Sequence, residues 1–249
     1  MSKSDTGRLY ARVSTDLGAQ IAEGVFPVGA RLPSERHLAQ TYGVSRPTVR
    51  EAIIALELDG LVEVKMGSGV YVVSRLPKGG QASETDMGPF ELLEARRAIE
   101  GETCALAATH IDADSMAELE ALVAEMDAAA ADIAASEAAD RRFHVAIASA
   151  TGNSALVAAV EMLWDARARS PQYRLLSDKA HTAGVMPRLD EHVMILEALR
   201  SKDADAARAA MRSHLTRVLD SLLEATEVQE LEQARARVDA QRRRYVAAR

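Results

Sequence analysis

The sequence has a single cysteine and no long apolar run, and each absence removes a class of protein. Cys104 is the only cysteine among 249 residues, so an intramolecular disulfide is excluded. It lies in a helical pattern of small apolar residues, where a buried and unreactive thiol is expected. No apolar stretch is long enough to span a bilayer, and no charged and apolar leader opens the chain. We therefore expect a cytoplasmic protein with no membrane partner.

Excess positive charge is also missing, which at first argues against a nucleic-acid partner. The net charge is −7, from 30 Lys and Arg against 37 Asp and Glu. The deficit is uneven, because residues 1–76 carry 9 basic against 8 acidic side chains and the remainder carries 21 against 29. The acidic remainder should stay away from phosphate, so the front of the chain is the part that can approach DNA. The length suits two domains of ordinary size.

Residues 32–51 combine the signals of two short helices joined by a tight turn. Ser34 can cap the first helix by accepting a backbone N–H bond, and Gly43 ends that helix. Ser45 repeats the cap, and Pro47 falls in the first turn of the second helix, where its missing N–H costs nothing. The spacing therefore predicts a helix-turn-helix.

Residues 61–72 predict two alternating strands around a glycine turn. The apolar side chains of one face are Val62, Val64, Val70 and Val72. Gly67 and Gly69 permit positive φ at the tip, and Lys65 lies beside it. A tip without bulky side chains can approach a groove closely. The helix-turn-helix and this ribbon together predict a winged helix-turn-helix.

Three polar residues near the start of the second helix are suited to reading DNA. Arg46, Thr48 and Arg50 lie at the end of the helix that contacts base edges in helix-turn-helix proteins. An arginine fork can bind guanine O6 and N7, or a phosphate. The alternative is that the basic residues of this segment are solvated charges on a small α/β module, namely Arg36, Arg46, Arg50 and Lys65. Their joint position at the open ends of the expected elements favours binding to double-stranded DNA.

The segment 8–74 resembles the GntR family of bacterial transcription regulators. The resemblance is carried by residues 32–36 (Leu-Pro-Ser-Glu-Arg), 44–52 and 67–72. It implies that the three arginines contact operator DNA, with help from Thr48 and from Gly67 of the wing. The predicted DNA-binding residues are Arg36, Ser45, Arg46, Thr48, Arg50, Lys65 and Gly67.

The composition changes after Pro89 to Ala, Leu, Glu and Arg with a period near 3.6. We expect helices at about 90–109, 113–130, 132–150, 154–169, 185–201 and 203–225, joined by short loops and hence antiparallel. An earlier helix is expected over residues 8–24. The fold class predicted is mainly α.

These signals divide the chain into four predicted parts. Residues 6–75 form a winged helix-turn-helix with a small β-hairpin, and residues 76–87 form a polar linker. Residues 88–226 form an all-α antiparallel helical bundle. Residues 227–249 form a charged tail, which we interpret as a protruding last helix in preference to a basic arm for DNA.

One carboxylate and three imidazoles fall on helices that are patterned to pack inward. Asp140 and His144 are four residues apart and therefore share a helix face. His192 and His214 lie on two later helices. Such a set would hold a divalent transition metal of borderline softness, such as Zn, Ni or Mn, although inward histidines are more often hydrogen-bonded core residues than ligands.

Residues 88–225 resemble the FCD domain, the effector-binding bundle of the FadR branch of GntR regulators. The resemblance assigns Asp140, His144, His192 and His214 to a metal beneath an effector pocket, with zinc favoured over nickel and manganese. It places Arg96 opposite a small carboxylate effector, and the alternative is an i,i+4 pair with Glu100. Asn153 either lines the pocket or caps a helix.

Within that branch the chain looks most like the hexuronate-operon repressors, notably at residues 8–10, 51–57, 88–96 and 153–156 and at the lone Trp164. The resemblance implies a homodimeric repressor that responds to a small carboxylic or sugar acid, since a two-fold protein matches a near-palindromic operator. Two alternatives stay open. One is a metallohydrolase with an accessory DNA-binding domain, for which no His-Glu-x-x-His motif or dedicated general base is found. The other is a regulator whose metal is purely structural.

Overall fold

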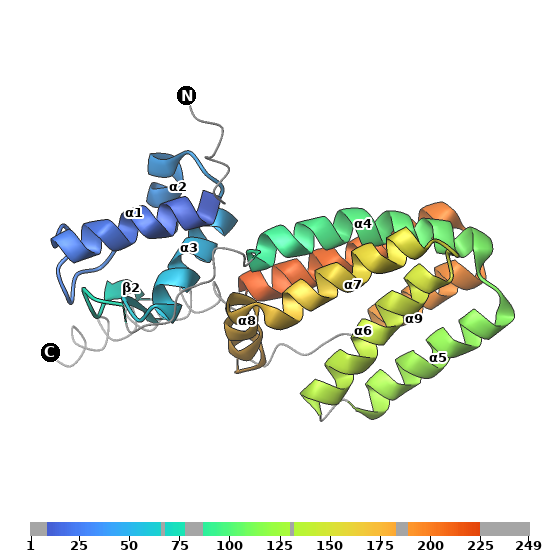
Figure 1. Cartoon of the computed structure of the whole chain (residues 1–249). Coiled ribbons are helices and arrows are strands. Elements are labelled where there is room, and N and C mark those ends of the chain that lie inside the picture. Colours follow the sequence, from blue (N-terminus) through green and yellow to red (C-terminus); the bar gives the residue numbers. More distant parts are fainter. Residues whose placement is uncertain (1–8, 66–67, 78–86, 130–131, 183–188, 225–249) are drawn as a thin grey trace, which may run out of the picture. The chain divides into compact units, whose positions relative to one another are not determined.

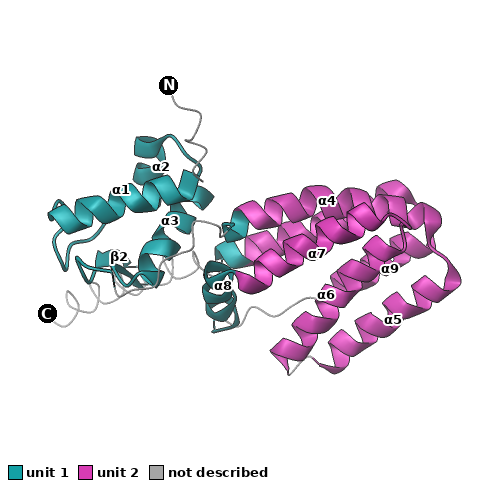
Figure 2. Cartoon of the chain, in the orientation of Figure 1, with its two compact units in different colours: residues 1–90, 170–184, 222–249 teal, residues 91–169, 185–221 magenta. Residues whose placement is uncertain are grey.

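The computed structural model describes residues 9–65, 68–77, 87–129, 132–182 and 189–224 (Figure 1). Internal contacts divide the chain into two compact units (Figure 2). The front unit comprises residues 1–90, 170–184 and 222–249, and the bundle unit comprises residues 91–169 and 185–221. The predicted domain bounds at residues 75, 88 and 226 stay predictions. The predicted tail, and the linker from residue 78 to 86, lie outside the described residues.

The front unit opens with the expected three helices and hairpin. The elements are α1 (Leu9–Glu23), α2 (Glu35–Tyr42), α3 (Arg46–Leu58), β1 (Val62–Lys65) and β2 (Gly69–Val72). Both predicted serine caps are confirmed, because Ser34 accepts a bond from the backbone of His37 and Ser45 accepts one from Thr48. Gly43 ends α2 with φ 65°, a left-handed conformation that glycine adopts without strain.

The core of this region is apolar. Side chains from α1, α2, α3 and the hairpin bury one another, with Leu17, Ile21, Val49 and Leu56 each 1% exposed or less. The hairpin is antiparallel, with Val62 opposite Val72 and Val64 opposite Val70. The predicted apolar face of the wing therefore packs against the helices.

One helix of the front unit was not predicted. The predicted helices left residues 170–184 non-helical, but α8 spans Pro171–Thr182. The Oγ of Ser170 accepts a bond from the Tyr173 backbone N–H at 3.2 Å, and Pro171 begins α8, where its missing N–H costs nothing.

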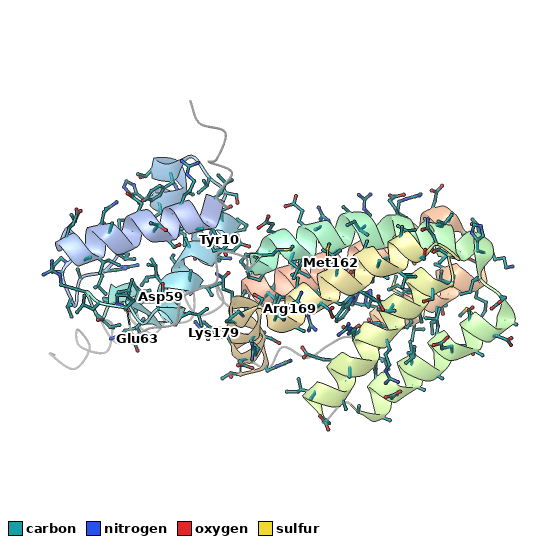
Figure 3. All side chains as sticks on the ribbon, viewed as in Figure 1. Tyr10, Asp59, Glu63, Met162, Arg169 and Lys179 are labelled. Atoms are coloured by element: carbon teal, nitrogen blue, oxygen red, sulfur yellow. The ribbon has the colours of Figure 1, made fainter. Side chains whose placement is uncertain are left out.

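A single carboxylate of α3 joins this helix to the wing. Lys179 of α8, labelled in Figure 3, donates from Nζ to Glu57 Oε2 at 2.6 Å. The other oxygen of Glu57 accepts a bond from the Val64 backbone N–H at 3.3 Å. The position of α8 in the front unit thus depends on a residue of α3.

The bundle is built from α4 (Pro89–His110), α5 (Ala113–Ala128), α6 (Ile133–Ser149), α7 (Ser154–Arg169) and α9 (Leu189–Arg200), followed by a helix over residues 204–224. The mainly α fold class is confirmed. Caps at Asp112 and Asp132 begin α5 and α6. The structure contains, among the described helices, none that is both long and apolar enough to cross a membrane.

Cys104 lies inside α4 and is fully buried. Burial, and then the negative charge of Glu100, raise the pKa of its thiol to about 12. The thiol is therefore protonated at neutral pH, as expected for an inert core cysteine.

Candidate DNA interface and metal centre

The predicted DNA-binding residues of the front unit divide into exposed and buried side chains. Arg36, Ser45, Arg46 and Lys65 are exposed, and Thr48 is half-buried with its Oγ1 2.7 Å from Ser45 Oγ. These residues lie on α2, on the N-terminus of α3 and on β1. Gly67 lies outside the described residues.

Arg50 differs from the other arginines because its side chain is only 6% exposed. Its Nε donates to Glu35 Oε1 of α2 at 2.9 Å, and Nη2 of Arg46 lies 3.7 Å from the second oxygen of the same carboxylate. Glu35 therefore holds the first turn of α3 against α2. Arg50 therefore links α2 and α3 in this conformation, and its contact with DNA stays a prediction.

Gly69 and Lys65 form the last strand pair before the turn of the wing. Gly69 has φ 115°, and a Cβ there would meet the Arg31 Nε at 2.4 Å. Lys65, opposite Gly69 in the hairpin, lies 5.3 Å from the centroid of the Tyr71 ring and 3.5 Å from Glu63. The positive φ favours glycine at this position, whereas the flexible end of the Arg31 side chain could move aside.

The bundle unit brings the four predicted metal ligands together. Asp140 and His144 come from α6, His192 comes from α9, and His214 comes from the helix at 204–224. One ligand atom of each residue lies within 4.8 Å of all the others, and the three imidazoles are buried. The Oδ1 of Asp140 lies 2.9 Å from His192 Nε2 and 3.4 Å from His144 Nε2. We call these four residues the ligand ring.

Two further carboxylates, which the sequence did not assign to this site, contact the ring from outside. Glu100 Oε2 lies 2.5 Å from His144 Nδ1, a close ion pair that is not a well-directed hydrogen bond. Glu191 Oε2 lies 2.9 Å from His214 Nδ1. Each of these imidazoles therefore has its Nδ1 engaged and its Nε2 left for the ring.

Residues of the ligand ring and the neighbouring Glu100 have pKa values shifted by burial and by one another's charges. Burial raises the pKa of Asp140, but His144 and His192 outweigh it and hold that pKa well below its ordinary value. Burial likewise opposes ionisation of Glu100, yet Arg96 and His144 bring its pKa to about 2. Burial lowers the pKa of His214 to about 4, so this imidazole is neutral at pH 7.

These residues fit a divalent transition metal. Neutral imidazole and carboxylate groups are suitable ligands for zinc, nickel and manganese. Burial lowers the pKa of His144, but Glu100 and Asp140 outweigh burial and raise it. A fully buried His144 Nε2 makes no well-directed hydrogen bond within the described residues. A cation in the ring would supply the partner that this atom lacks.

Arg96, the predicted effector-binding residue, forms the i,i+4 pair that we considered as its alternative. Its Nε and Nη2 donate to the two oxygens of Glu100 at 2.6 and 3.3 Å. Its guanidinium lies 4.0 Å from the Trp164 ring centroid, and that ring lies 5.2 Å from the His144 ring. The arginine is thus connected to the ligand ring through Glu100.

Asn153 acts as a helix cap. Its Oδ1 accepts bonds from the backbone N–H groups of Ala155 at 3.0 Å and Leu156 at 3.4 Å. The capping interpretation therefore explains this residue, and a contact with an effector stays a prediction.

Sequence comparisons connect both regions to known regulators. The profile of the GntR family, described as bacterial regulatory proteins, matches residues 9–72. The profile of the FCD domain matches residues 91–217. The chain belongs to the GntR family.

Its similarity to individual family members extends over most of the chain. It is 40% identical over 220 residues to the Exu regulon transcriptional regulator of Escherichia coli K12, covering 86% of this chain and 84% of that one. It is 38% identical to the Uxu operon transcriptional regulator of the same strain, covering 92% and 93%. The resemblance to hexuronate-operon regulators is thereby confirmed. These proteins are transcriptional regulators and not enzymes, so the metallohydrolase alternative has no support.

A solved structure shares the fold. The E. coli McbR/YncC structure superposes with a TM-score of 0.50 at 24% sequence identity, covering 87% of this chain and 97% of that one. At this identity the likeness shows the architecture alone.

Proposed function

We propose that this GntR-family regulator is a metal-dependent repressor that binds operator DNA as a homodimer and releases it when a small carboxylic or sugar acid binds. The observation that carries the proposal is the ligand ring, buried in a helical bundle on the same chain as a winged helix-turn-helix. The relatives named for the Exu regulon and Uxu operon favour a hexuronate as the acid. The protein would act in the cytoplasm.

Arg96 and the metal together suit such an effector. A divalent ion, zinc in our preferred assignment, would supply a Lewis acid that binds hydroxyl and carboxylate oxygens. The guanidinium offers N–H groups beyond those that Glu100 accepts, and these can pair with a carboxylate. Asn153 stays a second candidate contact.

On the DNA side, the exposed Arg46 and the capped N-terminus of α3 favour contact with base edges, and Arg36 and Lys65 favour contact with phosphate. A homodimer would present two such surfaces to two half-sites. Release requires that the acid bind the DNA-free arrangement more tightly, because equal affinity for both shifts nothing.

The experiment is a mobility-shift titration with DNA from upstream of the gene and its neighbours. We expect a shift that galacturonate or another hexuronate abolishes, and we expect EDTA to remove this response. Arg50→Ala should abolish the shift while the far-ultraviolet circular dichroism stays native. A shift retained by this variant contradicts a role of Arg50 in operator binding.

Two variants test the bundle. His144→Ala combined with His214→Ala should remove the metal found by elemental analysis, because half of the ring is lost. Arg96→Ala should keep the metal but weaken acid binding by about 1.5–3 kcal/mol, the value of a hydrogen bond between charged groups. Metal that stabilises the chain, in calorimetry that detects no acid binding, would instead support a purely structural metal.

A further inference from the structure

Two series of side-chain contacts, each with the same three residue types, end on the ligand ring. In the first, Arg96 pairs with Glu100, and Glu100 pairs with Nδ1 of His144. In the second, Arg217 Nε lies 3.0 Å from Glu191 Oε1, and Glu191 Oε2 lies 2.9 Å from His214 Nδ1. Each series consists of an arginine, a buried glutamate and an imidazole of the ring.

We propose that Glu100 and Glu191 are positioning residues of the metal centre, and that Glu100 alone also couples the metal to the anion bound at Arg96. This inference rests on the proposed function, since it assumes that the ring holds a metal and that Arg96 meets an acid. It assigns two unequal roles to two carboxylates that make similar contacts.

The positioning role follows from the nitrogen that each glutamate contacts. An imidazole that coordinates through Nε2 must carry its proton on Nδ1. Glu100 and Glu191 each place a carboxylate oxygen within 3 Å of such an Nδ1. A carboxylate in this place fixes the tautomer and the ring orientation of a metal ligand, and its loss commonly weakens metal binding by about 10–100-fold.

The third imidazole supports the assignment by contrast. Among the described residues, the buried Nδ1 of His192 has neither a hydrogen-bond partner nor a carboxylate in an ion pair, whereas His144 Nδ1 has the ion pair with Glu100. The Nε2 of His192 faces Asp140. Its ring is instead held by an edge contact with Phe143, with centroids 5.2 Å apart. A carboxylate thus contacts the Nδ1 of His144 and of His214 but not the Nδ1 of His192.

The unequal roles follow from the two arginines. Arg96 is 3% exposed, lies 4.0 Å from the Trp164 ring centroid and uses two donors on Glu100. Any anion that draws its guanidinium away removes positive charge from Glu100, which then interacts more strongly with His144. Arg217 is 38% exposed, so solvent screens its effect on Glu191.

Coupling between two binding events is reciprocal. The acid therefore changes the affinity for metal by the same factor by which the metal changes the affinity for the acid. Glu100→Gln keeps the size of the side chain but removes the shared negative charge. This factor should then approach one in Glu100→Gln and keep its wild-type value in Glu191→Gln.

The test measures the affinity of the full chain for Zn²⁺ by chelator competition, with and without galacturonate, and the affinity for galacturonate by calorimetry, with and without Zn²⁺. Both variants should lose about 10–100-fold in Zn²⁺ affinity, and both should alter the visible spectrum of the Co²⁺-loaded protein. Galacturonate affinity at saturating Zn²⁺ should change in Glu100→Gln alone. Glu102→Gln is the matched control, because Glu102 lies on α4 in an exposed pair with Arg208 and should behave as wild type.

Each result decides between named alternatives. Variants that bind Zn²⁺ as tightly as wild type, with an unchanged Co²⁺ spectrum, contradict the positioning role. Equal changes in galacturonate affinity or in the coupling factor contradict the separate role of Glu100. A wild-type chain that binds neither Zn²⁺ nor galacturonate contradicts the proposed function itself. If Glu100→Gln fails to fold, Glu100→Asp keeps the charge and should show Zn²⁺ affinity between that of wild type and that of Glu191→Gln.

Discussion

The two regions of the chain use their interiors in opposite ways. The winged-helix region, residues 9–77, packs apolar side chains inside, and among its described residues the buried charged groups are Arg50 and Glu51. Its predicted DNA contacts are mostly exposed. The bundle unit buries two carboxylates, an arginine and three imidazoles, namely Arg96, Glu100, His144, Glu191, His192 and His214.

The difference teaches where each region can be regulated. Apolar burial stabilises the winged helix whatever small molecules surround it, because the hydrophobic effect is non-directional and needs no ligand. Buried charges are tolerated only while they are paired, so removal of one partner should destabilise the bundle. Four substitutions sharpen or break this comparison.

Glu100→Leu should have the largest effect. It leaves Arg96 as a buried charge without its carboxylate, and breaking a buried ion pair costs about 3–5 kcal/mol. Urea unfolding followed by circular dichroism measures the loss. Glu102→Leu, at an exposed position of the same helix, should cost far less. Equal losses would show that the pair at Glu100 has no special role in stability.

Leu17→Ala should destabilise the winged-helix region by about 3 kcal/mol, since a fully buried leucine leaves a cavity. Metal uptake by the bundle should not change. The control is Leu9→Ala, because Leu9 lies on the same helix and is 53% exposed. A coincident loss of metal binding would contradict the independence of the two interiors.

Arg46→Ala should weaken operator binding by about 1–3 kcal/mol, the range for a base or phosphate contact made by one arginine. The thermal midpoint should stay the same, because the side chain is 55% exposed and lies 3.7 Å from Glu35. Fluorescence anisotropy of labelled DNA measures the affinity. Arg12→Ala, which removes an exposed arginine outside the predicted set, should bind as wild type.

The smallest effect concerns alkaline pH. Burial, and then the hydrogen bond to Asp16, raise the pKa of Tyr42 to about 12. In the unfolded chain the phenol ionises near pH 10, so its stabilising contribution is complete below that pH and is lost as the pH rises towards 12. Tyr42→Phe should flatten this part of the stability profile. Superimposable profiles for the two proteins would contradict the shift.

Local sequence signals predicted the winged helix almost completely. Caps, a glycine at positive φ and alternating valines each determine structure within a few residues, so Ser34, Gly43 and Ser45 were interpretable without tertiary information. The helix at 171–182 was missed because a proline fits the first turn of one helix as well as the end of another.

The ligand ring was predicted in composition but not in its surroundings. The spacing of Asp140 and His144 indicated one shared face, whereas Glu100 and Glu191 reach His144 and His214 from other helices. No local period encodes such a contact between helices. The sequence indicated Glu100 only as a possible i,i+4 partner of Arg96, a pair that the structure contains.

The chain has one tryptophan, and it lies beside the ligand ring. Trp164 is 1% exposed, with Arg96 at 4.0 Å and Arg167 at 4.9 Å from its ring centroid. Indole emission changes when nearby charges move and is quenched by paramagnetic ions. Trp164 fluorescence should therefore report occupancy of the bundle without an added dye. The winged-helix region has no tryptophan that would add to this signal.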